Sequence, residues 1–186
     1  MSADRFPRVV SLACHDLRTP LATVYGFART LSRGGELDER SARFVGMIEA
    51  ASEQMTDLLD QLGVLARIES DRYEVGLVEA DTLELATTED ERVETVGEGA
   101  TLETDVQSLK RALQALAVAA ARHGGVPTVT WTVRGRELEL APVTSGAARV
   151  VTAEELLDFG SIVARRVIER LGGSVELDGE TLRVRL

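Results

Sequence analysis

Apolar residues in the first part of the chain recur with the spacing of a helix. They fall alternately four and three residues apart, which is the spacing of a coiled-coil seam. The seam positions are Val10, Cys14, Leu17, Leu21, Val24, Ala28 and Leu31. The run Ser32-Arg33-Gly34-Gly35 then provides a stop, so this pattern predicts one long amphipathic helix that ends near Ser32.

A second segment with the same spacing follows directly. Asp38 is suited to cap its start, and the pattern fades at Glu69-Ser70-Asp71. Its seam positions are Phe44, Ile48, Ala51, Met55, Leu58, Leu62 and Leu65. Because only a short turn separates the two helices, we expect an antiparallel helical hairpin.

A lone hairpin would leave further apolar side chains in contact with water. Two helices bury only one seam against each other, whereas this segment has apolar residues on other faces as well. These residues are Val9, Leu12, Phe27, Val45, Met47 and Leu59. Pairing two hairpins would cover them, so we expect a homodimer built around a dimeric four-helix bundle.

The pattern changes after about Tyr73 to short alternating runs and shorter helices. We therefore expect two modules, 1–73 and 74–186, and a multi-domain fold of class α and α/β. A helix is expected at 105–122, and Thr152 with Glu155 forms a capping box for another that runs to Leu171. The expected strands are 82–86, 101–103, 128–133, 137–140, 174–177 and 181–185. Strands and helices in this mixed order predict an α/β sandwich.

Charge and composition narrow the range of partners. The chain has 21 Lys and Arg against 31 Asp and Glu, a net charge of −10, which argues against nucleic acid or an anionic membrane as partner. A single cysteine, Cys14, excludes an internal disulfide. The most apolar stretch, 113–121, is far shorter than the ~20 residues of a membrane-spanning helix. We expect a cytoplasmic protein without a membrane anchor of its own.

The most reactive side chain in the hairpin is His15, in the run CHDLRTP. Each helical residue turns by ~100°, so His15 lies off the seam, with Asp16 beside it and Thr19 one turn further on. A neutral imidazole nitrogen is a competent nucleophile, and an adjacent carboxylate can orient the ring and take up its proton. From spacing alone, however, His15 is better explained as a surface residue of a coiled coil.

A resemblance favours the reactive interpretation. The stretch 9–75, and above all HDLRTPL, resembles the dimerisation and histidine-phosphotransfer domain of sensor histidine kinases. The resemblance implies that His15 carries the phosphoryl group and that Asp16 is its acid/base partner. It also implies that Thr19 acts in dephosphorylating a partner regulator. The other matched residues, which shape the site in that family, are Arg18 and Pro20.

The second module resembles the ATP-binding domain of the same family but lacks its nucleotide-handling residues. Ala115 and Ala119 stand where asparagines bind Mg²⁺ and phosphate, and a methyl group cannot coordinate a hard cation. The stretch 142–151 lacks the acid that reads adenine, and 157–160 places an acid where phosphate would approach. The segment before the last long helix is also too short for an ATP lid. We therefore expect a degenerate domain that holds no cofactor and no metal.

The leading functional hypothesis is a histidine phosphotransferase in two-component signalling. It would relay a phosphoryl group through His15 between aspartates of response-regulator receiver domains, which supply their own Mg²⁺. One alternative is an ATP-dependent histidine kinase with an unusual nucleotide site. The others are a non-enzymatic dimeric scaffold and a regulator phosphatase.

Overall fold

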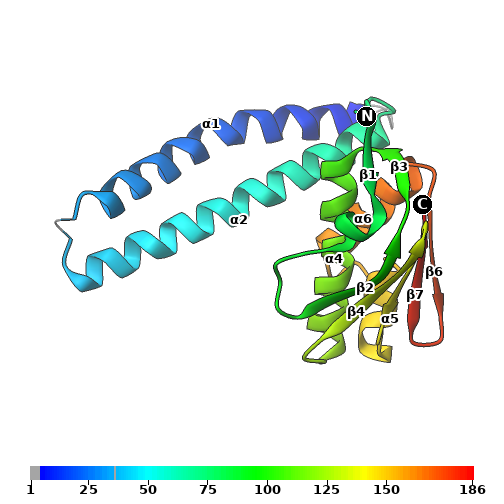
Figure 1. The fold of residues 1–186 in the computed structure, drawn as a ribbon. Helices are drawn as coiled ribbons and strands as arrows, with labels where there is room; N and C mark the ends of the chain where they lie inside the picture. Colours follow the sequence, from blue (N-terminus) through cyan, green and yellow to red (C-terminus); the bar gives the residue numbers. More distant parts are fainter. Residues whose placement is uncertain (1–4, 36) are drawn as a thin grey trace. The chain divides into compact units, whose positions relative to one another are not determined.

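The chain divides after Tyr73 into two units, Met1–Tyr73 and Glu74–Leu186, in the computed structural model (Figure 1). The structure describes residues 5–35 and 37–186. The division coincides with the change from long helical seams to short alternating runs. No described helix combines the length and the apolar character needed to cross a membrane.

The first unit is an antiparallel helical hairpin of α1 (Arg5–Arg33) and α2 (Glu39–Glu69), which confirms the expected hairpin (Figure 1). Asp38 caps α2, because its Oδ1 accepts a hydrogen bond from the backbone N–H of Ser41 at 2.8 Å. Ser70 closes α2, and its hydroxyl donates to the carbonyl of Ala66 at 2.7 Å. These local signals lie where the sequence pattern indicated them.

The contact between α1 and α2 buries one row of residues on each helix. On α1 the buried positions are Cys14, Leu21 and Ala28. On α2 they are Val45, Ser52, Gly63 and Ala66, with Leu59 half-buried. Both sets face the partner helix and exclude water from the interior of the hairpin.

This contact corrects the predicted seam of α2 by one residue. Val45, which we expected to be exposed, is buried, while most of the predicted seam is exposed. The exposed seam positions are Phe44, Ile48, Ala51, Met55 and Leu58. Two neighbouring apolar rows run along α2, and the periodicity alone does not say which of them faces α1.

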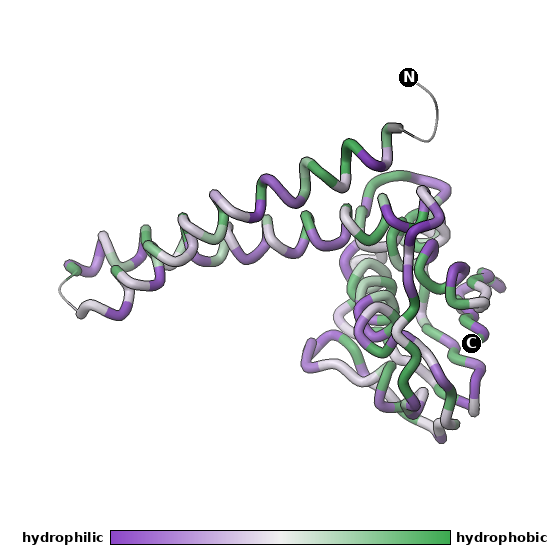
Figure 2. The backbone as a smooth tube through the Cα atoms, turned by 90° about the horizontal axis from the view of Figure 1, so that it is seen from above, coloured by the Kyte–Doolittle hydropathy of each residue, from purple (hydrophilic) through white to green (hydrophobic). Residues whose placement is uncertain are grey.

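A row of large apolar side chains remains exposed along the hairpin; we call it the apolar stripe. Figure 2 shows hydrophobic positions recurring along both helices. On α1, Leu17 is 54% exposed and Val24 is 48% exposed, although both belong to the predicted seam. The members of the apolar stripe are Leu17, Val24, Leu31, Phe44, Ile48, Met55 and Leu58.

The second unit contains a five-stranded sheet in the order β2-β4-β5-β7-β6. Its strands are β2 (Val93–Gly99), β4 (Val129–Gly135), β5 (Glu137–Ala141), β6 (Ser174–Asp178) and β7 (Thr181–Arg185). β2 runs parallel to β4, and all other pairs are antiparallel. The expected strands 128–133 and 137–140 form a hairpin, and so do 174–177 and 181–185. A separate antiparallel pair joins β1 (Val78–Asp81) to β3 (Thr101–Thr104).

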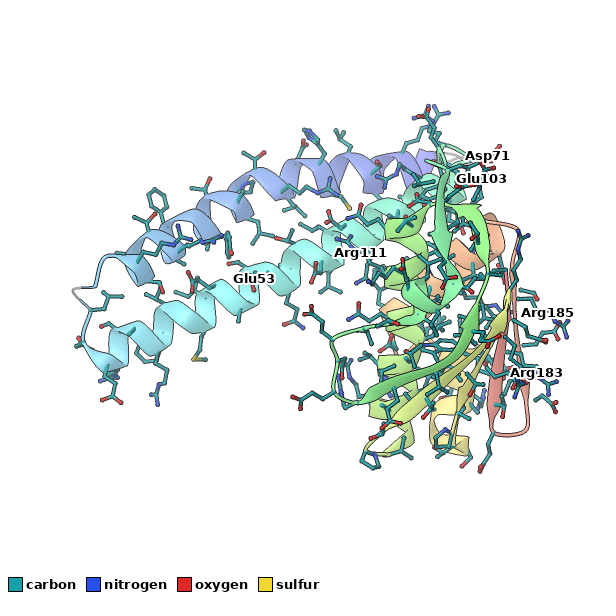
Figure 3. All side chains as sticks on the ribbon, viewed as in Figure 1. Glu53, Asp71, Glu103, Arg111, Arg183 and Arg185 are labelled. Atoms are coloured by element: carbon teal, nitrogen blue, oxygen red, sulfur yellow. The ribbon has the colours of Figure 1, made fainter. Side chains whose placement is uncertain are left out.

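Helices cover one face of this sheet (Figure 1). They are α4 (Val106–Gly124), α5 (Ser145–Val151) and α6 (Phe159–Arg170), with α4 packed against both of the others. The covered face carries the core, in which Trp131 is 0% exposed. The opposite face carries ion pairs such as Arg183 with Glu139, whose Nε and Oε1 lie 3.1 Å apart (Figure 3). A two-layer α/β arrangement results.

Segment 82–86 is a helix, α3 (Thr82–Ala86), and our expectation of a strand is wrong. Asp81 caps it, because its Oδ1 accepts from the N–H groups of Leu83 at 2.8 Å and Glu84 at 3.4 Å. The alternation of apolar and polar residues over five positions resembles a strand. The cap at the preceding residue decides the local structure.

The predicted start of the last long helix is also wrong. Thr152 ends α5, and α6 begins only at Phe159, where Asp158 accepts from the N–H of Ser161 at 2.8 Å. The sequence pattern missed α5 and the strands β1 and β2 entirely. Each is short, and Glu94, Glu98 and the glycines of β2 weaken its apolar alternation.

We predict an acid-dependent contribution of Asp90 to stability. Its side chain accepts hydrogen bonds from the Arg92 guanidinium at 2.9 and 2.7 Å and from the Arg92 backbone N–H at 3.0 Å. These bonds lower the pKa of Asp90 from 3.8 to about 2. The contribution is therefore complete above the unfolded pKa of ~3.9 and is lost as pH falls through about 2.

Asp90→Asn should lower the free energy of unfolding by about 1 kcal/mol at pH 7. Urea unfolding at several pH values checks this, and the gap to the wild type should shrink between pH ~4 and ~2. The neighbouring, exposed Glu91→Gln serves as control. A gap that stays constant down to pH ~2 would exclude the carboxylate as its cause.

Candidate functional site

His15 lies on the exposed side of α1. Its side chain is 78% exposed, whereas the preceding Cys14 is 1% exposed, because successive helical residues turn by ~100°. The His15 Nδ1 lies 3.2 Å from Oδ1 of Asp16. A carboxylate can only accept, so in the neutral ring Nδ1 carries the proton and Nε2 keeps its lone pair. The Nε2 atom of His15 can therefore act as a nucleophile.

Asp16 can serve this nucleophile in two ways. Its side chain is 67% exposed, so a partner protein can reach it. Its hydrogen bond to Nδ1 orients the ring, and it is placed to take up the Nδ1 proton when Nε2 forms a new bond.

Thr19 and Pro20 lie one turn after His15, and both are exposed. Thr19 is four residues from His15, so the two side chains share a face of α1. Pro20 lies inside the helix and has no N–H, which leaves the carbonyl of Asp16 without its usual helical donor. The structure thus places Thr19 on the same helix face as His15. One backbone hydrogen bond of α1 is missing at this turn.

Arg18 points to α2. Its Nε and Nη2 donate to Oδ1 of Asp60 at 3.1 and 2.8 Å. Gly63 of α2 lies beside this side chain, and a Cβ there would meet Nη2 at an ordinary contact distance of 3.4 Å. Arg18 therefore links α1 to α2 one turn from His15. It affects His15 only by holding α1 in place against α2.

Arg18→Met should destabilise the hairpin by about 1 kcal/mol, because it removes two charge-assisted hydrogen bonds between half-buried groups. Urea unfolding followed by circular dichroism checks the loss. A double-mutant cycle with Asp60→Asn separates this pair from the other interaction of Asp60. Arg33→Met at the far end of α1 is the control, and equal losses for Arg18 and Arg33 would refute a specific tie.

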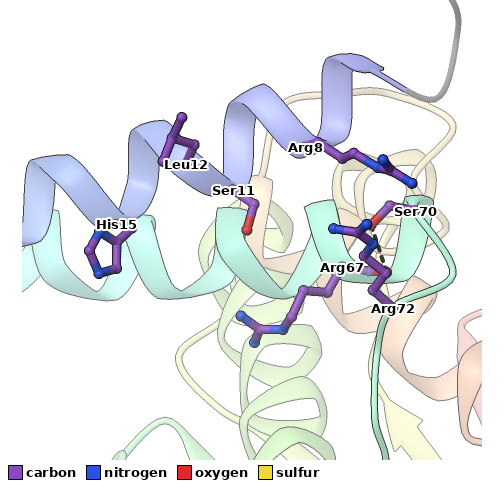
Figure 4. A pocket seen from close by; sticks show the side chains of 7 residues that line it. All are labelled: Arg8, Ser11, Leu12, His15, Arg67, Ser70 and Arg72. Carbon is purple, nitrogen blue, oxygen red and sulfur yellow. Dashed lines mark hydrogen bonds between the residues drawn. The ribbon is translucent and has the colours of Figure 1, made fainter.

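A groove of about 320 Å³ opens next to His15, between α1 and the end of α2 (Figure 4). From α1 it is lined by His15, Leu12, Ser11 and Arg8, which share one helix face. The residues that line it from α2 and the segment that follows are Arg67, Ser70 and Arg72. We name this feature the arginine groove.

Sequence reasoning missed the arginine groove. Arg67 and Arg72 are more than fifty positions from His15, and no motif links them. An antiparallel hairpin brings the end of α2 beside the start of α1. Placing Arg67 and Arg72 on the expected hairpin would therefore have predicted that they lie near the start of α1.

In the second unit, Ala115 and Ala119 lie on α4, at the positions that the resemblance compares with nucleotide-binding asparagines. Ala119 is 0% exposed inside α4, and Ala115 is half-buried, so neither offers an oxygen ligand or an opening. Asp158 caps α6 and lies 3.4 Å from Nε2 of His123 and 3.5 Å from an Arg122 nitrogen. Within residues 5–35 and 37–186, no three His, Cys, Asp or Glu side chains are grouped to hold a metal ion.

The hairpin matches a known family. Residues 8–71 match the His Kinase A (phospho-acceptor) domain. The probable sensor histidine kinase TcrY of Mycobacterium tuberculosis (strain ATCC 25618 / H37Rv) is 34% identical over 85 residues, which are 45% of this chain and 18% of TcrY. The chain thus spans less than a fifth of that relative. The hairpin is therefore similar to the phospho-acceptor domain of histidine kinases.

Two solved structures share the fold. The crystal structure of full-length ShkA in complex with AMPPNP superposes with a TM-score of 0.66 and 20% identity, covering 96% of this chain and 44% of ShkA. The Acinetobacter baumannii histidine kinase AdeS gives a TM-score of 0.58 and 15% identity, covering 92% of this chain and 96% of AdeS. A helical hairpin followed by an α/β sheet domain is therefore the arrangement of known histidine kinase structures.

Proposed function

We propose that this histidine-kinase-like chain of two-component signalling is a histidine phosphotransferase, which relays a phosphoryl group between receiver-domain aspartates through His15. The observation that carries the proposal is the exposed His15 ring, whose Nδ1 is hydrogen-bonded to Asp16 at 3.2 Å. This arrangement leaves Nε2 as a nucleophile that a partner protein can reach. The partners are response-regulator receiver domains.

The hairpin supplies the nucleophile and the proton acceptor of the proposed transfer. The lone pair of His15 Nε2 attacks the phosphorus of an aspartyl phosphate, the bond between phosphorus and the acyl oxygen breaks, and the aspartate leaves as a carboxylate. Asp16 takes up the Nδ1 proton and so neutralises the phosphorylated ring. The receiver supplies Mg²⁺ to the reaction. The same steps in reverse pass the group to a second receiver.

The second unit supports a relay over an ATP-dependent kinase. Alanines 115 and 119 cannot hold Mg²⁺ or phosphate, and Asp158 adds a negative charge where phosphate would approach. ShkA, which shares the fold, has been crystallised with AMPPNP, so ATP-dependent kinase activity is the second candidate to be tested. A dimeric scaffold and a regulator phosphatase acting through Thr19 are the remaining alternatives.

Two parallel labelling reactions separate these candidates. In one, a panel of receiver domains carrying ³²P-aspartyl phosphate is mixed with the full chain; in the other, the chain receives γ-³²P-ATP with Mg²⁺. Acid-labile label in the first reaction alone supports the relay. Label from ATP alone would replace the relay by a kinase. Label in neither would leave the scaffold, or the phosphatase if Thr19→Ala stops release of phosphate from a receiver.

We also propose that the apolar stripe is covered by a second copy of the chain, giving a four-helix bundle. The stripe lies on both helices of the hairpin, as a self-complementary interface requires. Val24→Glu should shift the protein from dimer to monomer, because burying the added charge costs several kcal/mol. Light scattering after gel filtration measures the mass. Ala22→Glu, exposed and off the stripe, is the control; a monomeric wild type would refute the dimer.

A further inference from the structure

The arginine groove has an unusual charge for this protein. The chain carries a net charge of −10, yet three of the seven side chains that line the groove are arginines and none is a carboxylate. Glu69 and Asp71 flank Ser70 in the sequence but do not line the groove. The charged side chains that line the groove are therefore all positive, against the net charge of the whole molecule.

The three guanidinium groups are available for a ligand. In the part of the chain that the structure describes, none of Arg8, Arg67 and Arg72 forms an ion pair, whereas Arg18 is bound to Asp60. Figure 4 shows Arg8 reaching from α1 toward the segment after α2, where Arg72 lies, while the Arg67 side chain extends along α2 away from both. Three unpaired cations that line one groove favour the binding of an anion there.

The groove also lies next to a nucleophile. It ends at His15, whose Nε2 keeps its lone pair because Nδ1 is held by Asp16. A guanidinium group presents a planar fork of N–H donors that matches the oxygens of a phosphoryl group. The hydroxyl of Ser11 adds a neutral donor on the same face of α1.

We propose that the arginine groove binds the dianionic phosphoryl group of an acyl phosphate and holds it for transfer to His15 Nε2. This inference rests on the proposed function in using His15 as acceptor, and it adds the positioning residues and the class of donor. Arg67 and Arg72 bind the phosphoryl oxygens from the α2 side, and Arg8 binds them from the α1 side. Charge on the oxygens is then neutralised as the bond to the acyl oxygen breaks.

Two kinds of donor could present an acyl phosphate to this groove. A receiver domain presents an acyl phosphate as aspartyl phosphate, and a small molecule such as acetyl phosphate presents the same group without a protein. In both cases a bond forms between Nε2 and phosphorus, a carboxylate leaves with the electron pair, and the Nδ1 proton passes to Asp16. A groove of about 320 Å³ has room for the small donor.

The test compares both donors on the same variants of the full chain. Acid-labile label from ³²P-acetyl phosphate and from a ³²P-receiver is timed for the wild type, Arg67→Ala, Arg72→Ala and Arg33→Ala. We expect the first two variants to slow labelling by about tenfold, as loss of a charge-assisted contact implies. Arg33→Ala, at the other end of α1, should label as the wild type does.

Inorganic phosphate provides a readout that does not depend on transfer. Titrated into ¹⁵N-labelled His15→Gln protein, it should shift the N–H signals of residues around the groove, and Arg67→Ala should abolish the shifts. The proposal that the groove binds the phosphoryl group would be refuted if phosphate shifts no signal around the groove. It would also be refuted if the arginine variants label at the wild-type rate. A receiver that labels His15 normally in those variants leaves the relay intact. Label from acetyl phosphate but from no receiver would refute the proposed relay between receivers, while the proposed phosphoryl binding by the groove would stand.

Discussion

Replacing His15 with alanine is expected to abolish acid-labile phosphorylation of this protein, with a loss of at least about 100-fold in label from any phosphorylated receiver. Nε2 of His15 is the nucleophile of the proposed transfer, and no other described side chain lines the groove with a nucleophilic ring nitrogen. The measurement is the ³²P transfer assay, with acid and alkali stability used to identify phosphohistidine.

The fold should not change in this variant. His15 is 78% exposed and its side chain hydrogen-bonds to the exposed neighbour Asp16, so the free energy of unfolding should stay within about 0.5 kcal/mol. Circular dichroism and urea unfolding verify that. Thr19→Ala, one turn away, is the matched control and should still accept the phosphoryl group. Wild-type labelling of His15→Ala would disprove the assignment of His15.

Gly97→Ala is expected to destabilise the second unit by about 3 kcal/mol or more. Gly97 lies in β2 with φ +115°, and a Cβ built there would come 2.0 Å from the backbone carbonyl oxygen of Val133 in the parallel strand β4. A backbone atom of a central strand cannot move away without breaking its ladder. The fluorescence of Trp131, the single tryptophan, reports the loss because it lies in β4 and is completely buried.

Gly179→Ala separates the clash from the backbone angle. Gly179 has φ +60° in the turn between β6 and β7, and a Cβ there would meet no atom within 4 Å. The substitution should therefore cost only the ~1 kcal/mol of a left-handed alanine. Equal losses at both positions in urea unfolding would show that the contact with Val133 relaxes freely. Helical signal from the hairpin serves as an internal reference in both variants.

Local signals along the chain predicted much of the fold. Asp38, Asp105 and the glycines at 124–125 mark helix ends because a cap is a contact between residues a few positions apart. The alternating runs at 128–133 and 137–140 predicted a hairpin because strand neighbours across a tight turn are also near in sequence. Short windows failed where two periods fit equally well, as in 82–86, which Asp81 turns into a helix.

For the candidate site, the sequence by itself determined which side chains surround His15 on its helix. Asp16, Thr19 and Pro20 lie within five residues of it on one helix, so their placement follows from helical geometry. Only the tertiary structure decided which apolar row of α2 faces α1, and that Arg18 reaches Asp60. It alone brought Arg67 and Arg72 to the groove beside His15. Such contacts join residues far apart in the chain, and their partners are chosen by packing and charge in three dimensions, which periodicity does not record.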